Sequence, residues 1–555
     1  MKIYIFVFVC IVLLQWVIGE HDQQVVQESH DGQLVQPQTL QKRSFINKQL
    51  QIILLYDEDL KQSKMFSKIK KSMKSASKYW EKTLKVKTNC KKAIHIPREC
   101  TDKSNVVAMR NNILSCVNAQ CKEDRKIQGV NIPDVYLSSC HHQMNNEYKE
   151  IYSEGRGLAP NQLLIVVTGQ CKIPSYKSTL ISGVIVQTHP STGRPILGVI
   201  NYCLKEKELN AIGDNQFLAV TKHEIARILG FHPSVYEHEN FTSATPPSVQ
   251  NISLSWLSTK GTYEVQKTIL SLPKMLKEAR EHFDCQELQG IELDEIYFSH
   301  RIMGNDLMTR FQLESSRVSR ITLAYFEDIN MYEVDYSMAD DFKWGKGLGC
   351  DFVLKSCYEY IKERKSRGQD IQPYCDIPSE QKCASYENGI GTCALYKHKN
   401  QLNEVNQYMD DSFTFTDTQK EKYGGYSFFD YCPVLVVHSY EKDESSLCDR
   451  KSDLEPDSTL DLFLDYRGPD SACFMDETIE YVSGSKIYTA KNTPMCHKFQ
   501  CSKNYGVEVI FNGQLFECPV EGGIIHIRPH MKKGYLAINI QCPKCTSLCK
   551  DNCPK

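Results

Sequence analysis

Apolar runs alternate with amphipathic stretches in the first half of the chain. Residues 50–57 (LQIILLYD), 161–171 (NQLLIVVTGQC) and 193–203 (GRPILGVINYC) are apolar and rich in β-branched side chains, which is typical of buried strands. Residues 61–87 carry apolar side chains at helical spacing among many lysines, which predicts a helix with a solvated basic face. A second helix is predicted at 214–230. This order indicates an α/β arrangement with the second helix beneath a sheet.

The pattern changes after Gly230. Residues 242–258 are rich in Ser, Thr and Pro and predict a loop, and residues 264–280 predict a helix. From Gly349 onward the chain is dense in Cys, Gly and Tyr, with short strand-like runs that include 507–519. That run contains Asn-Gly, a hairpin turn signal. This last part is therefore expected to be mostly β.

The N-terminus has the pattern of a signal peptide. Residues 1–19 contain an early Lys, an apolar run and a small residue for cleavage, and the apolar run is short for a membrane span. Residues 20–43 are polar and end in Lys-Arg, which we interpret as a short propeptide with a dibasic cleavage site. No second hydrophobic stretch follows directly. We therefore expect secretion, with no transmembrane segment in the mature chain.

Cysteine usage agrees with an extracellular protein. The chain has 24 cysteines, and because Cys10 lies in the predicted signal peptide, 23 remain. So many cysteines are typical of an oxidising compartment, where disulfides stabilise the fold. The odd count leaves one thiol unpaired or paired with another chain. The close spacing from Cys542 to Cys553 also suits a zinc site, but disulfides are favoured in a secreted chain.

Two further features limit the class of partner. Asn240 and Asn251 lie in Asn-Phe-Thr and Asn-Ile-Ser, which are acceptor patterns for N-glycosylation on a secretory route. The formal net charge is −2, so nothing in the charge balance indicates a nucleic-acid partner.

The motif with the clearest chemistry lies in QFLAVTKHEIARILGFH (216–232). Zinc peptidases with His-Glu-x-x-His place two histidines on one helix face to bind the metal, and the Glu is the general base. Here His223 and Glu224 are present, but Arg227 stands where the second histidine is expected. A guanidinium stays protonated and has no lone pair for a metal, so we expect weakened zinc binding. His232 is a candidate substitute ligand.

Several segments, in the right order, resemble the leishmanolysin family of metzincin zinc metallopeptidases (peptidase family M8). HEIARILGF resembles the family's HEIxHxLGF helix apart from Arg227, and REHFDCQELQGIELD resembles the segment that supplies the third zinc ligand. YFSHRIMGNDLMTR resembles the Met-turn region, with Tyr297-Phe298 in place of the family's His-Trp. GRPILGVINYC, KWGKGLGCDFVLKSC and GGYSFFDYCPV also look like the family. The resemblance implies His223 and His282 as zinc ligands, Glu224 as general base, and Met308 beneath the metal.

The resemblance also implies an α+β fold in three parts. A metzincin-type α/β part with the catalytic helix is expected at 44–231. A central mixed part with the third zinc ligand and the Met turn is expected at 232–345, and a cysteine-rich, mostly β part at 346–555.

Two functions follow from this pattern. The resemblance implies one Zn²⁺ per chain and a metalloendopeptidase that hydrolyses extracellular proteins or peptides, with activity impaired by Arg227. The alternative is an inactive pseudopeptidase that acts as a secreted binding or cell-adhesion protein with cell-surface ligands. In that case Glu224 and Arg227 form a plain ion pair. The sequence is compatible with both functions.

Overall fold

The computed structural model covers most of the chain after the predicted propeptide. It describes residues 46–554 apart from 89–91, 103–105, 109–113, 118, 145–146, 172–179, 190–191, 238–246, 411–412, 414–416, 438–445, 450–464, 531–533 and 551. The predicted signal peptide, the predicted propeptide and Asn240 lie outside the described residues. Within these described ranges, no helix has both the length and the apolar character needed to cross a membrane.

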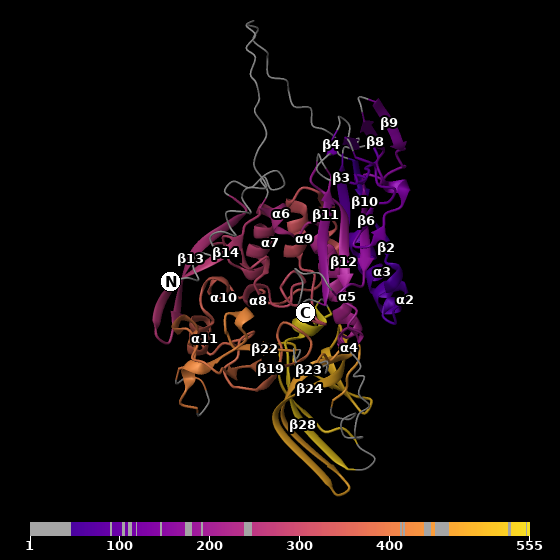
Figure 1. Ribbon diagram of the computed structural model, residues 1–555. Coiled ribbons are helices and arrows are strands. Elements are labelled where there is room, and N and C mark those ends of the chain that lie inside the picture. Colours follow the sequence, from indigo (N-terminus) through magenta and orange to yellow (C-terminus); the bar gives the residue numbers. More distant parts are fainter. Residues whose placement is uncertain are drawn as a thin grey trace, which may run out of the picture. The chain divides into compact units, whose positions relative to one another are not determined.

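A four-stranded sheet lies beside the helix that carries His223 (Figure 1). Its strands, in spatial order, are β11 (Ile181–Thr188), β12 (Pro195–Tyr202), β10 (Gln162–Thr168) and β2 (Gln51–Tyr56). The last three run parallel, whereas β11 pairs antiparallel with β12 and forms an edge. Every residue of β12 is buried, which explains its continuous apolar sequence. The three strands predicted from the apolar runs are confirmed.

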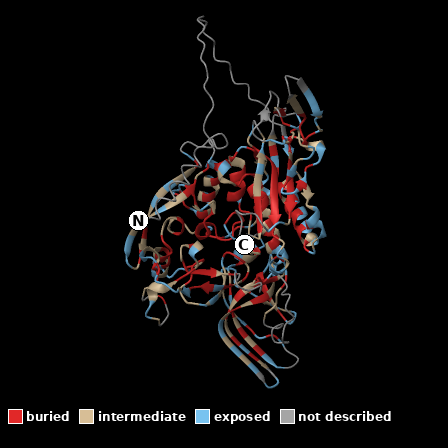
Figure 2. Ribbon diagram, in the orientation of Figure 1, coloured by how far each residue is buried: buried red, intermediate tan, exposed pale blue. Residues whose placement is uncertain are grey.

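Both faces of this sheet are covered. Helices α3 (Phe66–Thr83) and α5 (Asp214–Leu229) pack together against one face, and the Trp80 indole of α3 donates a hydrogen bond to a carbonyl of α5. Alternate residues of β10, such as Leu164 and Val166, face the other side and join a separate apolar cluster. Figure 2 shows these strands as a largely buried layer. Both predicted helices are confirmed, with α3 shorter than the stretch at 61–87.

The region after α5 differs from the prediction. Strands β13 (Val249–Ser258) and β14 (Gly261–Leu270) form an antiparallel hairpin, and α7 (Pro273–Phe283) begins only afterwards. The predicted loop at 242–258 is therefore wrong from Val249 onward, and the predicted helix at 264–280 is wrong up to Leu270. The physical reason is a period-two alternation of apolar and polar side chains through both segments, ended by a proline at the first turn of α7.

The segments that follow α7 pack into the same core as α5. They are β15 (Ile291–Asp294), β16 (Tyr297–Phe298), α8 (His300–Met303) and α9 (Arg320–Asp328). Short helices α10 (Cys350–Leu354) and α11 (Cys357–Ser366) come next. These elements bring residues more than 70 positions away in sequence against the face of α5 that carries His223.

The C-terminal region is mostly β, as predicted. A six-stranded antiparallel sheet has its own apolar cluster and the order β26 (Gln514–Glu517), β25 (Gly506–Phe511), β24 (Lys486–Ser502), β23 (Ser471–Ser483), β28 (Tyr535–Cys542) and β27 (Gly523–Ile527). The Asn512-Gly513 turn between β25 and β26 has positive φ at both residues, which the predicted hairpin requires. The described residues as a whole form a mixed α/β structure.

Eleven disulfides join the 22 cysteines of the described residues. Near the C-terminus, Cys542 pairs with Cys518, Cys545 with Cys553, and Cys549 with Cys501. The preference for disulfides over a zinc site at these cysteines is confirmed.

This pairing pattern predicts which cysteine is the odd one. Of the two cysteines outside the described residues, Cys10 lies in the predicted signal peptide, and the other is Cys90. We expect one maleimide adduct per mature chain after denaturation without reductant, and peptide mapping should locate it at Cys90. A Cys90→Ser variant should give none. A mature chain that takes up no maleimide, or one linked to a second chain through Cys90, contradicts this prediction.

Candidate functional site

Helix α5 presents three ionisable side chains to the interior, His223, Glu224 and Arg227, and all three are buried. The end of the helix is fixed because the Tyr332 hydroxyl donates to the carbonyl of Leu229 at 2.9 Å, one of the carbonyls that a helix end leaves unpaired. Gly230 follows with a φ of 128°, and the chain turns away there. The spacing inferred from the sequence therefore does place the motif on one buried face.

The edge strand β11 approaches α5 closely at Gly183. A Cβ atom there would lie 2.7 Å from the carbonyl oxygen of Glu224 and 2.9 Å from its Oε2, so this contact requires glycine. The Gly183 N–H donates a hydrogen bond to Glu224 Oε2 at 2.6 Å. Glu224 is thereby held between the helix and the edge of the sheet.

Glu224 and Arg227 form an ion pair within the helix. Arg227 Nη1 lies 3.4 Å from Glu224 Oε2, and the two side chains are only 9% and 7% exposed. Burial raises the pKa of Glu224 to about 7, although Arg227 and the Gly183 N–H act in the opposite direction. The carboxylate of the His-Glu motif is thus partly neutralised by the residue that replaces the second histidine.

His223 is oriented by the segment around Met308. Its Nδ1 lies 2.8 Å from the carbonyl oxygen of Leu307, which accepts a hydrogen bond when Nδ1 carries the proton. The lone pair of the neutral ring is then on Nε2. Burial lowers the pKa of His223 to about 3, so the imidazole is neutral at physiological pH. Met308 itself is fully buried, and its carbonyl accepts a hydrogen bond from the Phe298 N–H at 3.0 Å.

Tyr297 is the aromatic neighbour of this cluster. Its ring centroid lies 5.5 Å from that of His223, and Arg227 Cζ lies 5.5 Å from the same ring. The tyrosine is in β16, which pairs with β15 and leads into α8. Burial raises the pKa of its hydroxyl, so Tyr297 stays protonated at neutral pH.

His282 has different neighbours. It lies in the last turn of α7, where its Nε2 lies 2.8 Å from the carbonyl oxygen of Trp344 and its ring stacks on Phe342 at 4.9 Å. Its hydrogen-bond and ring contacts among the described residues do not include His223 or Arg227. Sequence reasoning missed the position of Tyr297 beside His223; the available signal was the departure from His-Trp just before the Met turn.

The remaining predicted residues make their hydrogen bonds outside the cluster, although burial and the nearby charge of Arg227 lower the pKa of His232. His232 is the N-cap of α6 (Pro233–Tyr236), and its Nδ1 accepts a hydrogen bond from the Ser234 N–H at 3.2 Å. Asn251 is exposed on β13, where its Oδ1 accepts a hydrogen bond from Thr268 at 2.8 Å. The two helix residues His223 and Glu224 are therefore the predicted site residues that the structure brings together.

The donor set around His223 does not fit a zinc ion. Protein zinc sites normally use at least three His, Cys, Asp or Glu ligands. In the part of the chain that the structure describes, the one such group with donor atoms close enough is Cys116, Cys121 and Cys140, and these cysteines are in disulfides. Beside His223, Arg227 is a cation without a lone pair and Tyr297 is a protonated phenol.

Comparisons with known proteins show that this chain has the sequence of a peptidase family. The family model for leishmanolysin, peptidase M8, matches residues 153–555. The chain belongs to the leishmanolysin family, which is a family of metallopeptidases. The donor set of this chain thus departs from what its family requires.

The relatives include animal and protozoan proteins. A leishmanolysin-like peptidase of Drosophila melanogaster is 25% identical, with 92% of this chain and 82% of the relative aligned. A leishmanolysin-like peptidase of Caenorhabditis elegans is 26% identical over 86% of this chain and 79% of its own length. Leishmanolysin of Leishmania major is 26% identical over 48% of this chain and 41% of its own length.

Proposed function

We propose that this leishmanolysin-family chain is a secreted, non-catalytic peptide-binding protein. The observation that carries the proposal is the cluster of Arg227 and Tyr297 around His223, in a family whose activity depends on a metal. We infer that Tyr297, and not His282, stands at the third ligand position, because its ring is the one beside His223. A single imidazole, that of His223, then remains where catalytic zinc sites use three protein ligands.

Electrostatic repulsion weakens zinc binding further, beyond the effect of the missing ligands. A guanidinium at this position would face a divalent cation in a site largely closed to water. At an effective dielectric constant of about 20, repulsion between such charges a few ångströms apart is on the order of several kcal/mol. The ion pair with Glu224 also occupies the carboxylate that would act as general base in a peptidase of this family. No proteolytic step can therefore be built from these residues.

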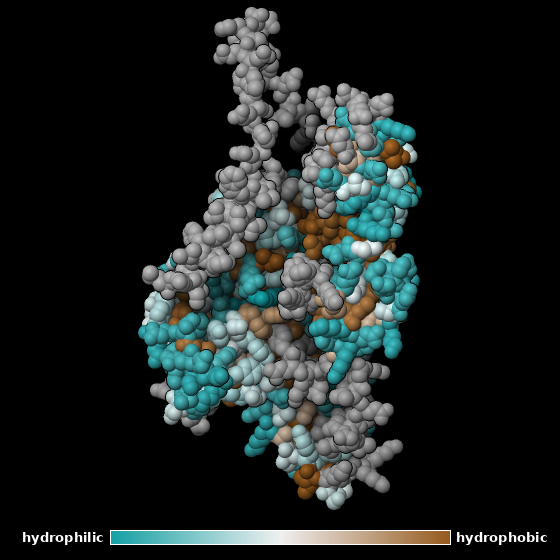
Figure 3. Space-filling model, in the orientation of Figure 1, coloured by the Kyte–Doolittle hydropathy of each residue, from teal (hydrophilic) through white to brown (hydrophobic). Residues whose placement is uncertain are grey.

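The peptide-binding element in this proposal is the edge strand β11. Because Gly183 donates its N–H to Glu224 and not to β12, alternate main-chain groups of β11 point away from the sheet. An extended peptide can add to such an edge by main-chain hydrogen bonds. Hydrophobic surface, brown in Figure 3, gathers in the part of this face where Figure 1 places β11. The eleven disulfides suit the extracellular compartment in which such peptides would be met.

Elemental analysis of the purified mature protein tests the proposal. We expect zinc far below one atom per chain after dialysis against zinc-containing and then metal-free buffer. Hydrolysis of casein and of quenched fluorescent peptides should stay at the level of a Glu224→Gln variant. One tightly held zinc per chain, or hydrolysis that a chelator abolishes, would contradict it and return the protein to the active peptidases.

A further inference from the structure

We infer that Arg227 turns the family's metal position into a receptor for a peptide carboxylate. The inference rests on the proposed function, since a site that held zinc would not leave the guanidinium free to bind an anion. It concerns ligand chemistry: peptides with a carboxylate that reaches Arg227 from the β11 edge are bound in preference to neutral peptides.

The first argument is that Arg227 is buried with most of its donors unused. A guanidinium has five N–H donors, and buried polar groups are normally paired. Nη1 has one acceptor, Glu224 Oε2, at a long 3.4 Å, and the buried Nε has no hydrogen-bond partner. Among the described residues, none accepts a hydrogen bond from Nη2. The side chain is therefore a largely buried cation whose Nη2 end is open to water and which lacks an anion of good geometry among the described residues.

The second argument is that the guanidinium is held in place before any ligand arrives. Arg227 lies in the last turn of α5. Its guanidinium is positioned over the Tyr297 ring and forms an ion pair with Glu224. Arginine stacked on an aromatic face has lost much of its rotational freedom already. A ligand carboxylate then gains charge-assisted hydrogen bonds with little further loss of side-chain freedom at the arginine.

The third argument concerns competition from Glu224. Its Oε2 already accepts the Gly183 N–H at 2.6 Å, a much shorter bond than the one from Arg227. Glu224 is thus held mainly by the edge strand, and it engages only the Nη1 end of the guanidinium. The Nη2 end remains for a ligand. The other neighbours of Arg227, His223 and Tyr297, contribute no negative charge, because the first is a neutral imidazole and the second a protonated phenol.

Fluorescence anisotropy with the full mature protein tests the inference. The probes are fluorescein-labelled pentapeptides of alternating Val and Thr with Glu, Gln or Leu in the centre and an amidated C-terminus. A fourth probe keeps the Gln centre but has a free C-terminal carboxylate. We expect the Glu peptide, the free-acid peptide, or both to bind about tenfold or more tighter than the amidated Gln peptide. The two carboxylate probes show whether the site binds a side-chain carboxylate or a C-terminal carboxylate.

Variants assign the preference to Arg227. In Arg227→Met the carboxylate peptides should fall to the affinity of the Gln peptide, and the Gln peptide itself should change little. Arg320→Met, which removes an exposed cation on α9, should keep the full preference. Equal binding of charged and neutral peptides, absence of binding by all four, or an unchanged preference in Arg227→Met each overturns the inference. A preference that EDTA removes would instead overturn the proposed function, because it would reveal a bound metal.

Discussion

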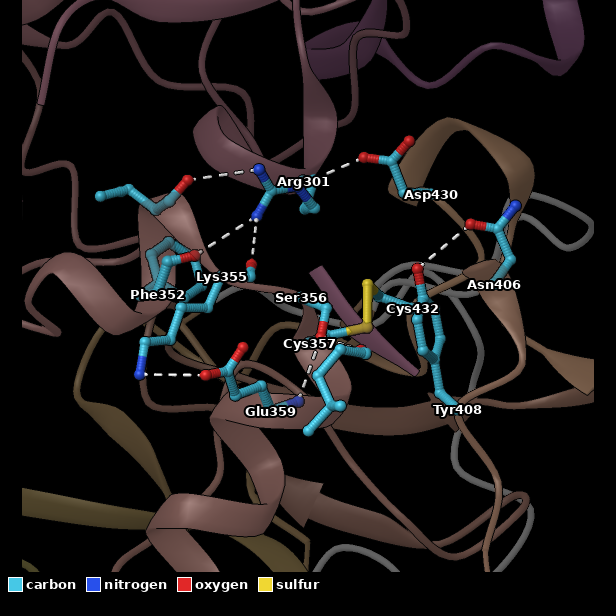
Figure 4. The surroundings of a disulfide bond; sticks show 12 residues. Arg301, Phe352, Lys355, Ser356, Cys357, Glu359, Asn406, Tyr408, Asp430 and Cys432 are labelled. Atoms are coloured by element: carbon cyan, nitrogen blue, oxygen red, sulfur yellow. Dashed lines mark hydrogen bonds and ion pairs between the residues drawn. A yellow bond between two sulfur atoms is a disulfide. The ribbon is translucent and has the colours of Figure 1, made fainter. Parts of the chain in front are cut away.

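Replacing Arg301 with methionine should lower the free energy of unfolding by about 3–5 kcal/mol, the range found when one partner of a buried ion pair is removed. The Arg301 side chain is fully buried, and its Nη2 lies 2.8 Å from Glu292 Oε2. Its Nε lies 3.3 Å from Asp430 Oδ2, and its guanidinium stands 4.7 Å from the Trp256 ring. Figure 4 shows Arg301 also donating to backbone carbonyls that include that of Phe352, close to the Cys357–Cys432 disulfide.

The cost arises from the acids that the arginine leaves behind. Burial alone would raise the pKa of Glu292, but Arg301 and Lys267 together hold it below its ordinary value. Without Arg301, the buried Glu292 and the partly exposed Asp430 share one lysine, since Lys267 contacts both carboxylates. One of them must then take up a proton or remain a poorly compensated charge.

Denaturant titration with intact disulfides, followed by tryptophan fluorescence, measures this loss. Arg320→Met is the matched control, because Arg320 makes a comparable ion pair with Glu278 at 2.7 Å but is 54% exposed. An exposed pair contributes about 0–1 kcal/mol. If Arg301→Met does not accumulate as folded protein, Arg301→Lys supplies the comparison, since it keeps the charge and loses the fork of donors. Equal midpoints for the two methionine variants would contradict the prediction.

The sequence was most informative where one physical signal dominated. The strands at 50–57, 161–171 and 193–203 were predicted because a sheet covered on both faces needs continuous apolar residues. The hairpin at 249–270 was missed because its Ser, Thr and Gln residues resemble those of a loop. Its alternation places Trp256 inward, where the indole packs against Arg301 and Lys267, and that burial depends on segments far away in sequence.

The same limit applies to the candidate site. The spacing of His223, Glu224 and Arg227 predicted one helix face, because helical geometry fixes neighbours three and four residues apart. The packing of α7 and β16 decides which later residue lies beside His223. Similarity of a segment to a family motif does not determine this packing. His282 and Tyr297 both lie in motif-like segments, yet the ring beside His223 is that of Tyr297.

Restoring two histidines should create a zinc site. In a variant with both Arg227→His and Tyr297→His, three imidazoles would surround the position that His223 now faces alone, a donor set typical of zinc. We expect about one zinc per chain after dialysis, against a negligible amount in the natural protein. A rise in the melting temperature on adding zinc should accompany it, because a ligand that binds only the folded state stabilises that state.

The single variants decide between the two candidates for the third ligand. If His282 were that ligand, Arg227→His alone would complete a set of three histidines and should bind zinc as well as the double variant. If Tyr297 stands at that position, Arg227→His supplies only two histidines, and its zinc should be lost on dialysis. Adding His282→Ala to the double variant should then leave the zinc content unchanged, since the His282 ring is engaged with Trp344 and Phe342. Full zinc binding by Arg227→His alone would contradict the assignment of Tyr297, and it would leave Arg227 as the one side chain that separates this protein from a metal-binding member of its family.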